Sequence, residues 1–203
     1  MGVQDTGCLS RVPWGYGLVR SYDGRCHFYL SSKYIRSNFR LKDFNPANVH
    51  PYGVMEKLVA QLQTMRYSLG VPIIITSGYR RESNTHGSGL AADIVVPRKT
   101  FIQVTQAAYN VGFRRIEVVR RSGTSFWNLM SVGGHIHLDV YDGSGNNTGG
   151  TMYDCPSCDG IPCYPWYAWG IQGGWWATSR PNTFYQLMQN LKKNAGYTGY
   201  RGC

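Results

Sequence analysis

The sequence predicts an α+β fold in which a small, antiparallel-leaning sheet is flanked by helices. Short segments with strand-like patterns alternate with two segments in which apolar residues recur every three or four positions. The length of 203 residues and the hydrophobic content of 42% allow the chain to bury a substantial core. They predict one domain with extensions or one domain with a small second one.

The composition divides the chain into three parts. Residues 1–36 carry glycine and proline breaks and short aromatic segments, and we interpret them as a β-rich N-terminal arm. Residues 37–143 contain the regular helix and strand patterns. Residues 144–203 begin with a turn-rich linker and form an extension rich in cysteine and tryptophan, with a final helix predicted over residues 181–195.

Two helices are predicted in the central part. The first is expected to begin near Pro51 and to end at Gly70, and its apolar stripe consists of Met55, Leu58, Leu62, Met65 and Leu69. The second begins at residues 100–103, which have the capping-box pattern Thr-x-x-Gln, and ends at Gly112 with a left-handed stop. Both helices are expected to pack on the sheet.

Four strands are predicted around these helices. Residues 71–76, VPIIIT, form the continuous apolar run of a buried strand, and the others cover residues 91–96, 113–119 and 135–140. In the last strand polar and apolar residues alternate. Alternation places His135, His137 and Asp139 on one face and three hydrophobic residues on the core face.

Histidines and carboxylates in two separate segments predict one metal site. His86 precedes Asp93 by seven residues across a glycine-containing loop. The imidazole therefore lies on the loop and the carboxylate lies in the strand that follows it. Imidazole nitrogen and carboxylate oxygen are ligands that Zn²⁺ accepts, and a catalytic zinc takes three protein ligands and leaves a fourth position for water. We therefore expect residues 77–93 and 133–140 to meet around one zinc ion.

Five motifs carry a resemblance to a known family. They are NFRLKDF at residues 38–44, TSGYR at residues 76–80, His86-x-x-Gly89-x-Ala91-x-Asp93, AAYNVGF at residues 107–113, and His135-Ile136-His137. The segment containing them resembles the zinc peptidases of the D-alanyl-D-alanine carboxypeptidase and L-alanyl-D-glutamate endopeptidase group, and more distantly the zinc domain of hedgehog signalling proteins.

The resemblance implies roles for individual residues. His86, Asp93 and His137 would be the zinc ligands, Arg80 would contact a substrate carbonyl or carboxylate, and His135 would polarise water or steady the oxyanion. Several branches of the group carry an acidic general base three residues before the last histidine ligand, where this chain has Gly134. Three replacements remain open as the base, in the order His135, Glu117 and Asp139.

Charge and cysteine content suggest where the protein acts. The formal charge of +10 favours anionic partners. The basic residues are scattered as short pairs and form no known DNA-binding motif, which argues against nucleic acid as the partner. Neither a signal peptide nor a membrane span is expected. Six cysteines exceed the needs of a cytosolic enzyme. A phage virion component or a lysin released to the bacterial cell wall would combine these features.

The cysteine pairing stays open at this level. In the arm, a disulfide between Cys8 and Cys26 and two separate buried thiols are both compatible with the sequence. In the extension, Cys155 and Cys158 have the spacing of a zinc knuckle, but no second close pair follows, which favours disulfides. The extension also contains Trp166, Trp169, Trp175 and Trp176. These tryptophans form either a small hydrophobic core, which we favour slightly, or a surface on which sugar rings stack.

Three functions follow from these observations. The first, implied by the resemblance, is a zinc-dependent peptidase that hydrolyses peptide bonds of bacterial peptidoglycan, for cell-wall lysis or phage entry, with peptidoglycan and other phage virion proteins as partners. The second is a non-catalytic virion or wall-binding protein that retains a structural zinc site, because the usual base is missing. The third, a nucleic-acid-binding protein, predicts salt-sensitive retention of DNA without a metal.

Overall fold

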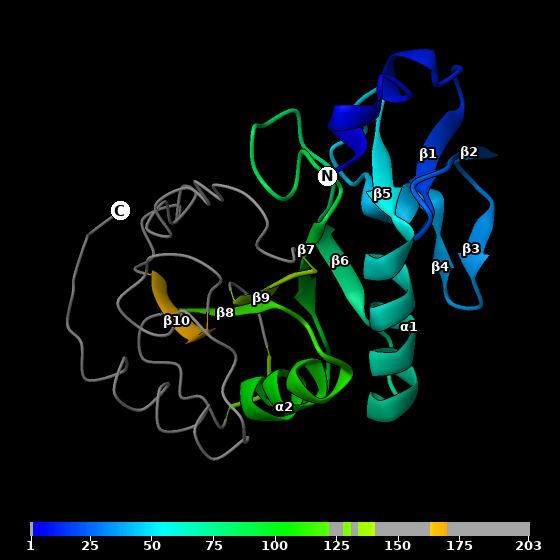
Figure 1. Ribbon diagram of the computed structural model, residues 1–203. Coiled ribbons are helices and arrows are strands. Elements are labelled where there is room, and N and C mark those ends of the chain that lie inside the picture. Colours follow the sequence, from blue (N-terminus) through cyan, green and yellow to red (C-terminus); the bar gives the residue numbers. More distant parts are fainter. Residues whose placement is uncertain (1, 122–127, 131–133, 141–162, 170–203) are drawn as a thin grey trace.

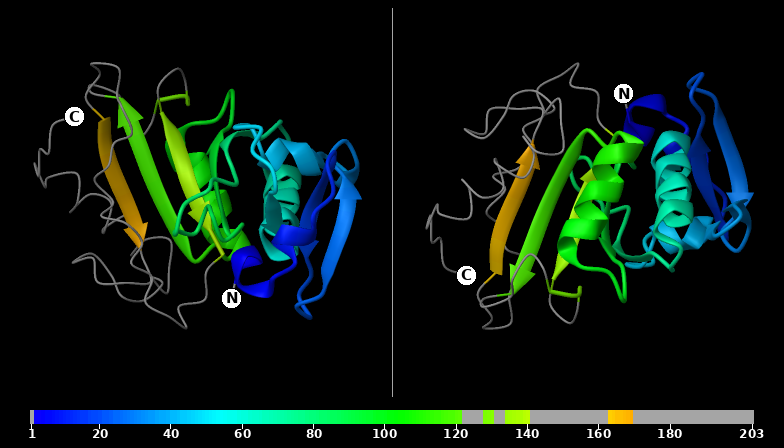
Figure 2. Two further views of the ribbon diagram at one scale, coloured as in Figure 1. Left: turned by 90° about the horizontal axis from the view of Figure 1, so that it is seen from above. Right: turned by 90° about the horizontal axis from the view of Figure 1, so that it is seen from below.

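The computed structural model describes residues 2–121, 128–130, 134–140 and 163–169, and the fold is reported for these residues (Figure 1). They form an α+β structure, as predicted. Figure 2 shows helix α1 between the N-terminal strands and a five-stranded sheet. The helices are α1 (Glu56–Leu69) and α2 (Phe101–Val111), with short 3-10 helices η1 (Val3–Thr6), η2 (Leu9–Arg11) and η3 (Leu41–Phe44).

The five-stranded sheet is antiparallel throughout. Its order is β10-β8-β9-β7-β6, and its strands are β6 (Ile74–Ser77), β7 (Ala91–Val95), β8 (Arg115–Arg121), β9 (His135–Asp139) and β10 (Cys163–Trp169). Four of these strands were expected from the sequence. The fifth, β10, lies in the cysteine- and tryptophan-rich extension, where no strand was predicted.

One face of this sheet forms the hydrophobic core. Alternate residues of β7, β8 and β9 are fully buried there, namely Ala92, Ile94, Ile116, Val118, Ile136 and Leu138. Helix α2 adds the buried side chains of Phe101, Val104 and Ala108 to the same cluster. The opposite face of the same strands carries the charged residues and the histidines.

The apolar segment 71–76 forms a strand, but it is not uniformly buried. Ile73 is buried, whereas Ile74 is 48% exposed. The reason is topological, because β6 is the last strand in the order of the sheet and pairs only with β7 among the described strands. An apolar run in the sequence does not distinguish an edge strand from a central one.

Helix α1 begins later than predicted. Pro51 was expected in its first turn, but the chain first forms strand β5 (Gly53–Met55), which pairs in parallel with β1 (Tyr16–Arg20). The helix then begins at Glu56 and ends at Gly70, as predicted, and Gly70 has the left-handed conformation with φ +67°. Four residues of the predicted stripe are confirmed, because Leu58, Leu62, Met65 and Leu69 are buried, whereas Met55 is the last residue of β5 and only partly buried.

The N-terminal arm supplies strands to a three-stranded sheet and to a small hairpin, both completed by strands after residue 36. The sheet has the order β2-β1-β5, with β2 at Cys26–Leu30, and the hairpin joins β3 (Tyr34–Arg36) to β4 (Phe39–Arg40). Cys8 and Cys26 form a disulfide, which decides between the two alternatives left by the sequence. Val3 and Leu18 of the arm belong to the same hydrophobic cluster as the helices and the five-stranded sheet.

Several predicted features fall outside the described residues. They are the linker after residue 142, the final helix over residues 181–195, the pairing of Cys155 and Cys158, and the surroundings of Trp175 and Trp176. Among the residues that the structure describes, none of the helices combines the length and the apolar character needed to cross a membrane.

Helix α2 has the capping box that the sequence predicted, and its contribution to stability can be tested. The amide of Gln103 donates to Thr100 Oγ1 at 3.3 Å, and the amide of Thr100 donates to Gln103 Oε1 at 2.9 Å. We predict that Thr100→Ala lowers the free energy of unfolding by about 1 kcal/mol in urea titrations. Thr64→Ala in the exposed middle of α1 is the control and should change it by less than about 0.5 kcal/mol. Equal effects would mean that the cap does not stabilise the fold.

Candidate metal centre

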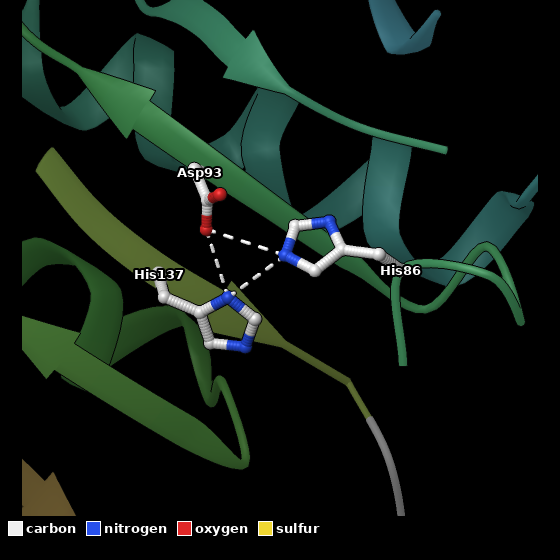
Figure 3. Close-up of side chains that lie close together, drawn as sticks. All are labelled: His86, Asp93 and His137. Carbon is white, nitrogen blue, oxygen red and sulfur yellow. Dashed lines mark hydrogen bonds and ion pairs between the residues drawn. The ribbon is translucent and has the colours of Figure 1, made fainter. Parts of the chain in front are cut away.

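Three side chains from two strands and one loop converge on the polar face of the five-stranded sheet. Asp93 of β7 and His137 of β9 are directly opposed across the two strands. His86 comes from the loop between β6 and β7, residues 78–90, which we call the His86 loop. Figure 3 shows both imidazoles and the carboxylate pointing toward one another.

The atoms that face one another form a small triangle. His137 Nδ1 lies 2.9 Å from Asp93 Oδ1 and 3.1 Å from His86 Nε2, and His86 Nε2 lies 3.3 Å from Asp93 Oδ1. All three residues are buried. A tetrahedral zinc ion with bonds of about 2.0–2.2 Å holds its ligand atoms roughly 3.3 Å apart. The three residues therefore fit a metal ion of this kind with little movement, and they are the one metal-compatible group found among the described residues.

A backbone carbonyl fixes the orientation of His86. His86 Nδ1 donates a hydrogen bond to the carbonyl oxygen of Gly78 at 2.7 Å, so Nε2 carries the lone pair that points into the triangle. Gly78 is itself pressed against η3, because the amide of Tyr79 donates to Phe44 O at 2.7 Å. A Cβ at Gly78 would lie 2.3 Å from Phe44 O, so only glycine allows this approach.

Two further carboxylates stand on the other side of His137. Glu117 of β8 is its cross-strand neighbour, and Asp139 Oδ2 lies 3.6 Å from His137 Nε2. Glu117 forms an ion pair with Arg115, which lies two residues earlier on the same strand and opposite Asp139 in the register. Both Glu117 and Arg115 are buried. A network of charged groups therefore surrounds the triangle.

The pKa values of these groups show that the centre favours a positive charge. Burial by itself raises the pKa of Asp93, but hydrogen bonds from His137 and His86 outweigh burial and hold it well below its usual value. Burial lowers the pKa of His137, yet its interactions with Asp139 and Asp93 outweigh burial and raise it to about 10. Without an ion, the carboxylates thus hold a proton on His137. The same carboxylates would stabilise a bound cation.

The two residues predicted to assist the chemistry lie at the border of this network. His135 is partly buried on β9, two residues before His137, and burial lowers its pKa, which favours the neutral imidazole. Arg80 Nη2 lies 3.9 Å from Asp93 Oδ2, and Arg80 Nε lies 3.7 Å from Glu82. Both separations exceed a hydrogen bond, so no strong interaction among these pairs holds the guanidinium in place.

The usual position of the acidic base cannot accept a side chain in this fold. Gly134 is buried, and a Cβ there would lie 2.6 Å from the ring of Phe101 and 3.1 Å from Val119 O. An acid at this position would have to displace the first residue of α2. Any general base must therefore come from another residue.

The sequence named every side chain of the triangle but missed two contributors. Arg115 is one of the basic residues that the sequence shows only as scattered short pairs, whereas in the structure it is buried in the network. Its spacing from Glu117 was the available signal, because residues two apart on a strand share a face. The carbonyl of Gly78 was also missed, and no sequence pattern distinguishes it, since every residue carries one.

The antiparallel sheet thus brings two histidines and an aspartate together as a ligand set that a metal ion accepts. A family model described as Peptidase M15 matches residues 38–139, which is half of the chain and includes all three residues. The chain therefore belongs to the Peptidase M15 family, which confirms the resemblance to zinc peptidoglycan peptidases found in the sequence. No curated protein and no solved structure matches the chain.

The Gly78 carbonyl gives a prediction about metal binding. Gly78→Ala should move the carbonyl away from His86 Nδ1 and weaken zinc binding by roughly 10- to 100-fold, the usual effect of losing such a partner. Competition with a chromogenic chelator measures the affinity. The control is Gly70→Ala, which strains the left-handed end of α1 far from the centre and should destabilise the fold while leaving the zinc affinity unchanged. Equal zinc affinities in both variants would exclude the role of the carbonyl.

Proposed function

We propose that the protein is a zinc-dependent peptidase that hydrolyses peptide bonds of bacterial peptidoglycan. One observation carries the proposal, namely the buried triangle of His86 Nε2, Asp93 Oδ1 and His137 Nδ1 with edges of 2.9–3.3 Å. Membership of a metallopeptidase family supports the reaction class. The expectation of peptidoglycan as substrate comes from the resemblance and agrees with the net charge of +10, which favours an anionic polymer.

The proposed roles follow from position. His86, Asp93 and His137 hold the metal, and Glu117 and Asp139 orient His137 from its other side. Zinc bound by three protein ligands supplies a Lewis acid that polarises a carbonyl and lowers the pKa of water. Arg80 at the border of the centre binds a carbonyl or carboxylate of the substrate, because its side chain is one-third exposed and the carboxylates of Asp93 and Glu82 lie beyond hydrogen-bond range.

His135 is the proposed proton acceptor. It shares the strand and the face of His137, and burial favours its neutral form, which can accept a proton. Glu117 is the second candidate, but its carboxylate is already paired with Arg115. This pairing makes Glu117 better suited to hold the imidazole of His137 than to receive a proton from the reaction.

The proposed substrate also implies where the protein acts. We place the protein at the bacterial cell wall, either released as a lysin or carried by a phage virion with other virion proteins as partners. The Cys8–Cys26 disulfide supports a location outside the reducing cytoplasm.

A second candidate function is favoured by Gly134. Because the ring of Phe101 leaves no room for an acid there, the protein could be a wall-binding or virion protein that retains the metal for stability. This candidate predicts binding to peptidoglycan without hydrolysis. The peptidase is preferred because His135 and Glu117 remain beside the ligands.

The test of the function is hydrolysis of purified peptidoglycan. We predict that the protein releases new amino termini, that a chelator abolishes the release, and that added zinc restores it. His137→Ala should reduce the rate to background, because the centre loses a ligand. Binding to peptidoglycan with no new amino termini would reject the peptidase and support the second candidate.

Two variants distinguish the candidate proton acceptors. His135→Gln should lower kcat by about 100-fold or more while zinc binding stays unchanged, since general-base catalysis contributes roughly that factor. Glu117→Gln should have the smaller effect on kcat and should weaken zinc binding through His137. The reverse order of the two effects on kcat would assign the proton to Glu117 and reject His135.

A further inference from the structure

The first residues of the chain lie directly against the His86 loop. The amide of Val3 donates to the carbonyl oxygen of Ser88 at 2.9 Å, and Gln4 Nε2 donates to the carbonyl oxygen of Glu82 at 3.1 Å. These two hydrogen bonds hold the loop on both sides of His86. They join segments that are about eighty residues apart in the sequence.

The contact is close enough to require small residues. A Cβ at Gly2 would lie 2.3 Å from Ser88 Cβ, and a Cβ at Gly89, whose φ is +68°, would lie 3.1 Å from Val3 Cγ1. Val3 is completely buried. Gly2 and Val3 are therefore packed against the loop as buried residues, while Gln4 contacts it from the exposed side.

Two anchors hold this segment in place, and they are neighbours in the N-terminal sheet. Arg20 is buried at the end of β1, and its Nη1 donates to the carbonyl oxygen of Gly2 at 2.6 Å. Cys26 of β2 is the cross-strand partner of Arg20 and forms the disulfide with Cys8, just after η1. One hydrogen bond thus fixes Gly2, and one covalent bond fixes Cys8 four residues after Gln4, to the same end of the paired strands β1 and β2.

The remaining support of the loop is mostly its own. The amide of Leu90 donates to Thr85 O at 2.8 Å and the amide of Gly89 donates to His86 O at 2.9 Å. From outside the loop, the amide of Met55 donates to Gly89 O at 2.9 Å and the amide of Val140 donates to Leu90 O at 3.1 Å, and the loop itself donates from the amide of Tyr79 to Phe44 O at 2.7 Å. A metal ligand on a loop binds tightly only if the loop is ordered before binding, because otherwise binding must also order it.

We propose that the segment Gly2–Gln4, held by Arg20 and by the Cys8–Cys26 disulfide, positions the His86 loop and thereby completes the metal centre. The segment lies outside the region matched by the family model, which begins at residue 38. The inference rests on the proposed role of His86 as a metal ligand. Arg20 and Val3 are positioning residues in this account, since they act through the loop.

The disulfide makes metal binding depend on oxidation. Thiol–disulfide exchange with a small-molecule disulfide forms the bridge: the thiols of Cys8 and Cys26 lose two protons and two electrons, and the small-molecule disulfide takes them up and leaves as two thiols. Of the two anchors, the reduced protein keeps the hydrogen bond from Arg20 to Gly2 and loses the disulfide. The oxidised protein, outside a reducing cytoplasm, has the ordered loop and the higher metal affinity.

The experiment measures zinc affinity by chelator competition in the oxidised full-length protein and its variants. Arg20→Met and the double variant Cys8→Ser with Cys26→Ser should each raise the zinc dissociation constant by about tenfold, the effect of one hydrogen bond to a charged group. Arg20→Lys should recover part of the affinity. The matched control is Leu30→Ala, an exposed residue of β2 in the same sheet, which should leave the affinity unchanged.

Two further readouts complete the test, one on the metal-free protein and one on the cobalt-substituted protein. In the metal-free variants the amides of Gly89 and Leu90 should exchange hydrogen faster, while the amides of α1 keep their protection, which excludes general unfolding. The absorption spectrum of the cobalt-substituted protein reports whether the ligand geometry changes. Unchanged zinc affinity with faster exchange would overturn the proposal and leave the peptidase intact. If the wild type binds no zinc, the proposed function fails, while faster exchange in the variants would still show that the segment orders the loop.

Discussion

The direct opposition of Asp93 and His137 across β7 and β9 is the constraint on which the rest depends. Because side chains alternate along a strand, this register puts the carboxylate and the imidazole on one face and Ile94 and Ile136 on the other. A shift by one residue would bury the charged groups in the apolar core. The packing of α2 on the apolar face therefore also fixes the geometry of the metal centre.

Burying so many charged groups on one sheet face is costly unless they compensate one another. Asp93, Glu117 and Asp139 are buried together with Arg115 and the imidazoles, and an isolated ion in such surroundings costs several kcal/mol. The ion pair of Glu117 with Arg115 offsets part of this cost. A positive charge between Asp93 and the two histidines offsets another part of the cost. The same need for positive charge raises the pKa of His137 to about 10 through its interactions with Asp139 and Asp93.

The sequence predicted the local features well because they depend on short-range chemistry. The capping box of α2, the left-handed glycines and the alternation in β9 each follow from a few neighbouring residues. The triangle of His86, Asp93 and His137 was predicted as well, since its spacing and its resemblance to the peptidase group agree. These calls needed no knowledge of which strands pair.

The features that the sequence missed all depend on long-range pairing. Pro51 satisfies the rule for the first turn of a helix, yet residues 53–55 pair with β1 and delay α1. The spacing of Arg115 and Glu117 shows that they share a strand face, but the burial of that face depends on the pairing of β8 with β9. The edge position of β6, which exposes Ile74, has the same origin.

Long-range pairing also explains why a peptidase centre would need an arm that its family model does not include. The strands supply Asp93 and His137 with a rigid register, but His86 is carried by a loop whose own hydrogen bonds are local. Such a loop gains order only from a surface that packs against it, and β5 provides one side of that surface. The segment beginning at Gly2 provides the other, and it can do so because β1 pairs with β5 on one side and with β2 on the other. The N-terminal sheet thus fixes β5 and the segment beginning at Gly2 relative to each other, and in this proposal the order of the His86 loop depends on both.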